Sequence, residues 1–233
     1  MWPFSLSQRH RRAVERDAIL QDIKTAQQNK DTPAIYAAFE RYFAGKHCQG
    51  ITGIETVNKA MFAIDRYDMA ESLRFATWCL PHMDRTEKTY VASMIMLITE
   101  VPGREDAQTL AGICDGMKAL AQQRVSTDYE WSAADRWHKT FDKLKKLDAD
   151  MALRVAVEAV INGGTKPHNS SLRLRAIALN AWQEMVESKA AQNPDDAKGE
   201  AARVAEGYES YNTDGDIFRL RARRVLSRLG QPS

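Results

Sequence analysis

Apolar residues recur along this chain at the three- and four-residue spacing of amphipathic α-helices, and almost no segment alternates apolar and polar residues as a half-buried strand would. The breakers Gly45, Pro81, Pro102 and Gly103 divide the apolar segments into pieces of helical length. The pattern therefore predicts an all-α fold of about nine or ten helices, arranged as stacked antiparallel helix pairs that are either helical-repeat-like or an orthogonal bundle.

Capping residues mark two helix starts. Asp31 or Thr32 precedes a helix with Pro33 in its first turn, and Gly45 follows the last apolar residue of that helix. Further along, Asp84 and a glutamate three residues later have the spacing of a capping box. These signals predict where two helices begin and where one ends.

The helix that follows Asp84 is apolar on nearly every side. Its apolar stretch, 91–101, is interrupted only by Ser93, Thr99 and Glu100. A helix that is apolar all round is typical of a buried, central position. The residues that we expect in the central core are Met94, Ile95, Leu97 and Ile98.

The segment from Asp65 to Pro81 resembles one tetratricopeptide unit. A tight turn is followed by an aromatic residue, Tyr67, and a small residue, Ala70, and the helix stops at the proline. The resemblance covers about 30 residues, and no second copy stands at a 34-residue offset. Since Asn58 differs from the small residue of that repeat's first helix, the segment predicts a helix pair and no family.

Two features bear on domain organisation. The helix over 104–125 contains Gly112 and Gly116 one turn apart, which predicts a close crossing with another helix. The segment 163–170 combines two glycines, a proline and the new capping residues Asn169 and Ser170, so it is the best candidate for a subdomain boundary. We nevertheless expect one continuous helical domain over residues 1–233.

Composition and charge narrow the possible environments. The 33 basic and 31 acidic residues give a formal charge of +2, too little to attract a polyanion through the whole-molecule field. Three cysteines without a CxxC pair favour a reducing compartment, and no stretch is long and apolar enough for a transmembrane segment. A secretory signal does not fit the first residues, and we expect a cytoplasmic protein.

Two stretches imitate metal sites. His47-Cys48 and Cys79-x-x-His82 offer two thiols and two imidazoles, but they lack the closely spaced ligand pair of structural zinc sites. The stretch 210–221 imitates a calcium loop, yet Ser210 stands at the first place and Arg221 at the twelfth, where a bidentate glutamate is required. We expect no metal.

Signatures of catalysis are lacking. The sequence contains no G-x-S-x-G elbow, no phosphate-binding glycine loop and no G-x-G-x-x-G fingerprint, and its five histidines are scattered. We expect no cofactor, and we favour a non-enzymatic protein over an enzyme of unrecognised family.

The last helix carries a basic surface. Its apolar stripe includes Phe218, Val225 and Leu226, which leaves five arginines around the polar side. Such a surface can contact phosphates or an acidic partner, although basic residues also complement a helix terminus. The candidate basic partner-binding residues are Arg219, Arg221, Arg223, Arg224 and Arg228.

One aromatic residue stands apart from the apolar stripe of its helix. Trp137 and Phe141 share a face with Leu144, so we expect them in the core, whereas Trp131 lies off that stripe. Trp131 is therefore a candidate groove residue.

Stacked helix pairs create grooves, and enzyme signatures are missing, so the first hypothesis is a cytoplasmic protein-binding or scaffold module that holds a helix or extended segment of a protein partner. The alternative is a nucleic-acid-associated protein that contacts phosphates through its C-terminal helix. A homo-oligomer is compatible with either reading.

Overall fold

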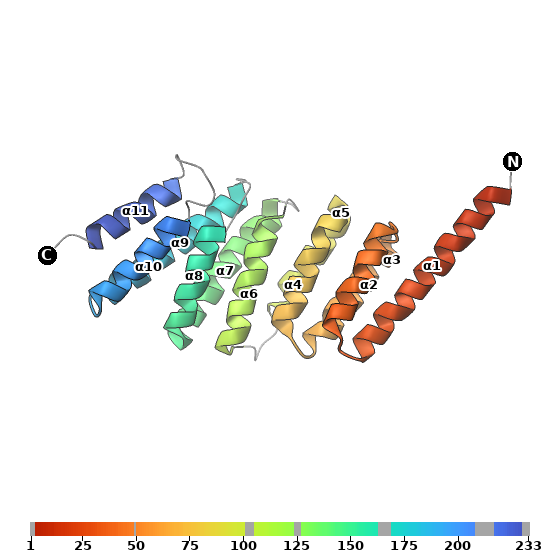
Figure 1. The fold of residues 1–233 in the computed structure, drawn as a ribbon, viewed down its shortest axis with the longest axis horizontal. Coiled ribbons are helices and arrows are strands. Elements are labelled where there is room, and N and C mark those ends of the chain that lie inside the picture. The colour runs from red at the N-terminus through yellow and green to blue at the C-terminus, as the bar shows by residue number, and fades with distance from the viewer. Residues whose placement is uncertain are drawn as a thin grey trace. The chain divides into compact units, whose positions relative to one another are not determined.

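The computed structural model of the chain describes residues 3–48, 50–100, 105–123, 127–162, 169–207 and 217–229. This part of the chain is all-helical, without a strand, and neighbouring helices pack in antiparallel pairs (Figure 1). The predicted fold class is confirmed, with eleven α-helices among the described residues where the pattern suggested nine or ten. They are α1 (Pro3–Gln28), α2 (Thr32–Ala44), α3 (Gly50–Asp65), α4 (Met69–Cys79), α5 (Arg85–Ile98), α6 (Ala107–Ala121), α7 (Thr127–Leu147), α8 (Ala149–Asn162), α9 (Asn169–Ala190), α10 (Pro194–Gly207) and α11 (Ile217–Leu229).

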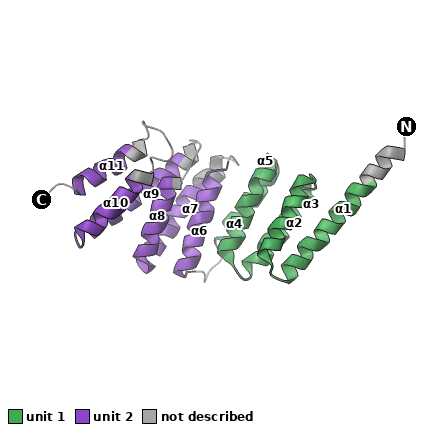
Figure 2. Cartoon of the chain, in the orientation of Figure 1, with its two compact units in different colours: residues 1–100 green, residues 101–233 purple. Residues whose placement is uncertain are grey.

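The helices form two compact units, 1–100 and 101–233 (Figure 2). In unit 1, α1 pairs with α2 and α3 pairs with α4, while α3 also packs beside α1 and α5. In unit 2, the pairs are α6 with α7, α8 with α9 and α10 with α11. The segment 163–170 belongs to unit 2, and 163–168 lie outside the described residues.

An aromatic cluster joins α2 to α4 in the core of unit 1. Phe39 and Phe75 are fully buried and meet edge to face, with their ring centroids 5.0 Å apart. Tyr36 packs edge-on against Trp78 at 4.8 Å. Such edge-to-face pairs add to the stabilisation that burial of the rings provides, so this cluster holds the two helices together.

Helix α2 begins as its sequence predicts, with Asp31 accepting a hydrogen bond from the Ala34 N–H at 3.0 Å. It ends at Ala44, but the left-handed residue at its end is Lys46 (φ 53°), whereas Gly45 has an ordinary φ of −73°. A Cβ on Gly45 would collide with the imidazole of His47. Gly45 is therefore needed for this close approach and not for a left-handed turn.

The capping box predicted at Asp84 is confirmed. Asp84 and Glu87 form a complete capping box, with bonds of 2.9 Å and 3.0 Å. Helix α4 begins after its cap Asp68 and ends at Cys79, just before the proline at which the sequence predicted its end, and the chain from Leu80 continues as a short 3₁₀ turn that contains Pro81. The proline sits within this turn, where its missing N–H breaks no α-helical hydrogen bond.

Of the four α5 residues expected in the central core, two are found there. Ile95 and Ile98 are buried, but Leu97 is 54% exposed and Met94 is half-buried. On α5, Tyr90 is 49% exposed and lies on the same side as Leu97, two helical turns away. One side of α5 thus packs against its unit, and an apolar side remains uncovered.

The core of unit 2 contains the predicted aromatic pair. Trp137 and Phe141 are buried and stacked, with ring centroids 4.8 Å apart. Gly112 and Gly116 are both buried on α6, which packs closely on α7. Their burial is compatible with the predicted close crossing, which stays a prediction.

Candidate functional site

The arginines of α11 divide into two groups. Arg221 donates a hydrogen bond to Gln183 of α9 at 3.0 Å, and Arg228 donates to Glu187 of α9 at 2.9 Å. Buried Ala222 and Val225 form part of the apolar contact of α11 with its neighbours. Arg221 and Arg228 therefore fix α11 on α9.

The other candidate arginines are Arg219, Arg223 and Arg224. Arg223 and Arg224 are exposed, while the side chain of Arg219 lies outside the described residues. Among the described residues, Arg224 makes no hydrogen bond or ion pair. The four candidate arginines whose side chains are described are thus all exposed, and two of them, Arg221 and Arg228, also bind α9.

The candidate groove residue Trp131 belongs to α7, but its side chain lies outside the described residues. The calcium-like stretch, 210–216, also lies outside them. In the part of the chain that is described, no three His, Cys, Asp or Glu residues cluster as a metal site would require.

Four large apolar side chains are exposed on α3 and α5. Ile51 is 76% exposed and Phe62 is 43% exposed; they are three turns apart on one side of α3. Tyr90 and Leu97 occupy the exposed side of α5. We call these four residues the α3–α5 surface.

The two helices that carry this surface run side by side in the same direction. Gly50 at the start of α3 donates a hydrogen bond to Glu87 in the first turn of α5, with a distance of 2.6 Å. Helix α4 connects them in the opposite direction, and the Ser72 hydroxyl on α4 donates to the Met61 carbonyl on α3 at 2.8 Å. Because α3 and α5 both pack on α4, their exposed sides face away from it.

Sequence analysis missed Ile51 and Phe62. The signal was present, because α3 buries Val57, Ala60 and Ile64 on one side and still carries two large apolar residues on the other. A second apolar side on a helix indicates a second contact.

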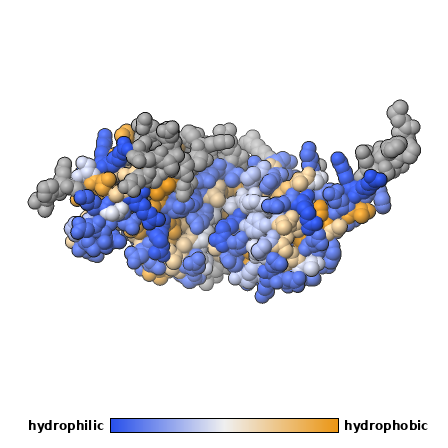
Figure 3. Space-filling view, viewed as in Figure 1, coloured by the Kyte–Doolittle hydropathy of each residue, from blue (hydrophilic) through white to orange (hydrophobic). Residues whose placement is uncertain are grey.

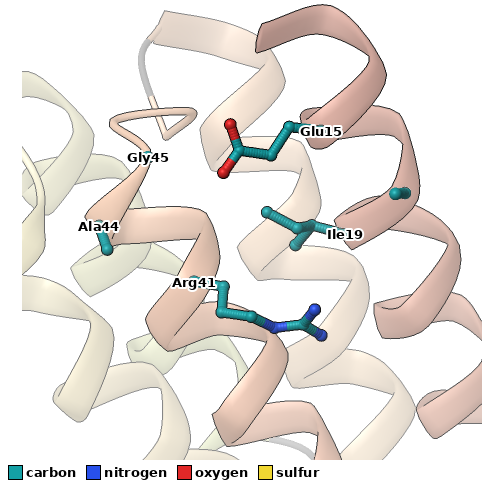
Figure 4. Close-up of a pocket in the computed structure, with 6 residues that line it drawn as sticks. Glu15, Ile19, Arg41, Ala44 and Gly45 are labelled. Atoms are coloured by element: carbon teal, nitrogen blue, oxygen red, sulfur yellow. The ribbon is translucent and has the colours of Figure 1, made fainter. Parts of the chain in front are cut away.

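A cavity of about 400 Å³ lies between α1 and α2 in unit 1. Glu15 and Ile19 project into it from α1, and Arg41 and Gly45 line it from α2 (Figure 4). Arg41 is already paired with Asp22 at 2.8 Å. The cavity thus offers one carboxylate and one neutralised guanidinium, with no convergent set of groups for catalysis.

Unit 2 contains a cavity of about 350 Å³, lined by residues of α7, α8 and α9 and by Gln192 after the end of α9. Its charged groups have opposite signs, and Lys145 pairs with Glu184 at 3.5 Å. Ser188 and Lys189 also line it, and no hydrogen bond between the Ser188 hydroxyl and a basic group is among the described contacts.

Burial keeps the three cysteine thiols protonated. Cys48, Cys79 and Cys114 are free and buried. Burial is the main cause that raises the pKa of each thiol, to about 12 for Cys48. A nucleophilic cysteine needs the opposite shift, so these thiols act as small apolar side chains.

On the face drawn in Figure 3, hydrophilic side chains predominate, and hydrophobic ones appear as separate patches. Among the described residues, no helix has both the length and the apolar character that a membrane span requires.

Comparisons with known proteins place the chain in no family: no family model, no curated protein and no solved structure matches it. The candidate site therefore rests on the chain's own surfaces.

Proposed function

We propose that the protein is a non-enzymatic, cytoplasmic protein-binding or scaffold module that holds a protein partner along α3 and α5. The observation that carries this proposal is the exposure of four large apolar side chains on two adjacent helices. Contiguous apolar patches on soluble proteins mark interaction sites more often than single exposed residues do. Apolar side chains on neighbouring helices are also the kind of contact that recognition of a partner helix uses.

The chemistry of the other candidate sites supports the same function. Opposite charges within or beside the two cavities pair with each other, as Arg41 does with Asp22. The cysteine thiols are held in their protonated form. Neither feature favours an enzyme over a binding module.

The test of this function is site-specific photo-cross-linking in cells that express the full chain. A photoreactive amino acid replaces Phe62 or Leu97 in turn, and a matched control replaces Leu147, which is 58% exposed on α7. We expect protein adducts from positions 62 and 97 and none from 147. Equal adducts from all three positions, or none from 62 and 97, would contradict the proposal.

Nucleic-acid binding is the second candidate, and the exposed side chain of Arg224 favours it. Its test is the affinity of the purified protein for duplex and single-stranded nucleic acid at several salt concentrations. Each phosphate neutralised adds about 0.7 to 0.9 to the slope of log affinity against log salt. A steep slope that Arg224→Gln reduces would support this function, whereas we expect no binding even at low salt.

A further inference from the structure

We infer that the partner of the α3–α5 surface is a second copy of this chain, whose own α3–α5 surface packs on it in a two-fold symmetric dimer. This inference rests on the proposed function, since it names the occupant of the same surface. In such a dimer each surface is both receptor and ligand, so it must be complementary to itself.

The polar side chain on the exposed side of α5 favours a helical occupant there. Ser93, between Tyr90 and Leu97, donates its hydroxyl hydrogen bond to the Tyr90 carbonyl at 2.6 Å. Its hydrogen is therefore engaged within its own helix. An extended segment would need hydrogen-bond partners for its backbone, whereas a helix satisfies its backbone internally. Helices α3 and α5 of a second copy meet this requirement.

The charges on the surface permit self-association. On α3 the charged residues between Ile51 and Phe62 are Glu55 and Lys59, which pair with each other at 3.7 Å. On α5 no residue between Tyr90 and Leu97 is charged. A surface with a net charge would repel its own copy, but this stretch of α3 and α5 carries equal and opposite charges.

The exposed area is close to what a dimer needs. With their exposed fractions, the four side chains present roughly 400 Å² of mainly apolar surface, since a large side chain carries about 150 to 250 Å². Homodimer interfaces are about 65% apolar, so this area corresponds to roughly 600 Å² per copy. Two such faces bury about 1,200 Å² in total, the lower end of specific interfaces.

The experiment measures the mass of the purified full chain by sedimentation velocity between about 1 and 100 µM, a range that brackets moderate affinities. We expect twice the chain mass of 26.3 kDa at the upper concentrations. The double variant Phe62→Glu, Leu97→Glu places two negative charges on each face, and we expect it to stay monomeric, with at least a tenfold weaker association. Leu147→Glu is the matched control and should still dimerise.

Circular dichroism and the melting temperature of each variant are the controls for folding. We expect both to match the wild type, since the changed residues are exposed. A wild type that is monomeric throughout overturns the inference, as does a dimer that the double variant retains or that Leu147→Glu also abolishes. Adducts with other proteins at positions 62 and 97, together with a monomeric purified chain, would leave the proposed function standing while this inference fails. Adducts at neither position would overturn both.

Discussion

Arg228 of α11 and Glu187 of α9 form an ion pair with a distance of 2.9 Å between Nη2 and Oε1. The same carboxylate oxygen accepts a hydrogen bond from Gln183, whose own amide oxygen accepts one from Arg221. A continuous chain of hydrogen bonds therefore links the two helices. Two arginines that sequence analysis assigned to a partner-binding surface thus contribute to the packing of their own helix.

This arrangement predicts that the arginines of α11 differ in their effect on stability. Arg228→Gln should lower the free energy of unfolding by up to about 1 kcal/mol, because exposed ion pairs contribute little more than that. Arg224→Gln should leave it unchanged. Urea unfolding at low and high salt measures both, and salt should reduce the difference between them. An equal loss for both variants would contradict the docking role of Arg228.

A second prediction compares the two sides of α5. Ile95→Ala should cost about 2 to 5 kcal/mol, because Ile95 is fully buried and its truncation leaves a cavity. Leu97→Ala should cost less than about 1 kcal/mol, as is usual for surface substitutions. Thermal or urea unfolding of the two variants decides the matter. A loss at Leu97 as large as that at Ile95 would place Leu97 in the core after all.

Local signals in the sequence predicted the helix starts but not the side of α5 that is buried. A capping box acts within one turn, so Asp84 and Glu87 are sufficient to define it. The burial of α5 depends on which neighbours pack against it, and a helix that is apolar all round gives no sign of its free side. The exposure of Ile51 and Phe62 could not be predicted for the same reason, because it depends on where α5 lies beside α3.

A third prediction concerns two glycines in opposite surroundings. A Cβ on Gly53 would lie 2.9 Å from Cys48 Sγ and 3.0 Å from Cys48 Cα, so Gly53→Ala should destabilise the fold by about 1 to 3 kcal/mol, as overpacking does. A Cβ on Gly199 meets nothing within 4 Å, and Gly199→Ala should stabilise α10 by about 0.5 to 1 kcal/mol. Melting temperatures that move in the same direction for both variants would disprove this reading.

The buried thiols predict that stability falls at alkaline pH. The pKa of Cys48 rises from about 8.5 in an unfolded chain to about 12 in the folded protein, mainly because of burial. Folding therefore favours the protonated thiol, and this contribution is fully present below about pH 8.5 and is lost as the pH rises toward 12. Urea midpoints measured from pH 7 to about 10 should decrease, and less steeply in Cys48→Ala. Parallel pH profiles for the two proteins would be inconsistent with this assignment.

The last prediction concerns the left-handed lysines at two helix ends. Lys30 and Lys46 have φ values of 54° and 53°. At the second site Lys46 N–H donates to the Phe43 carbonyl and His47 N–H donates to the Tyr42 carbonyl, the pairing of a Schellman motif. Glycine is the preferred residue at this position.

The left-handed conformation costs a non-glycine residue about 1 to 2 kcal/mol. Glycine loses roughly 0.5 to 1 kcal/mol more conformational entropy on folding. The cost of the left-handed conformation for lysine is therefore larger than the entropic cost of glycine. Lys46→Gly and Lys30→Gly should each raise the free energy of unfolding by about 0.5 kcal/mol or more, within the range found for compatible backbone substitutions. The matched control is Lys24→Gly in the interior of α1, which should lower it by about 1 kcal/mol. If Lys46→Gly destabilises the protein as Lys24→Gly does, the end of α2 is not under the backbone strain that its φ value implies.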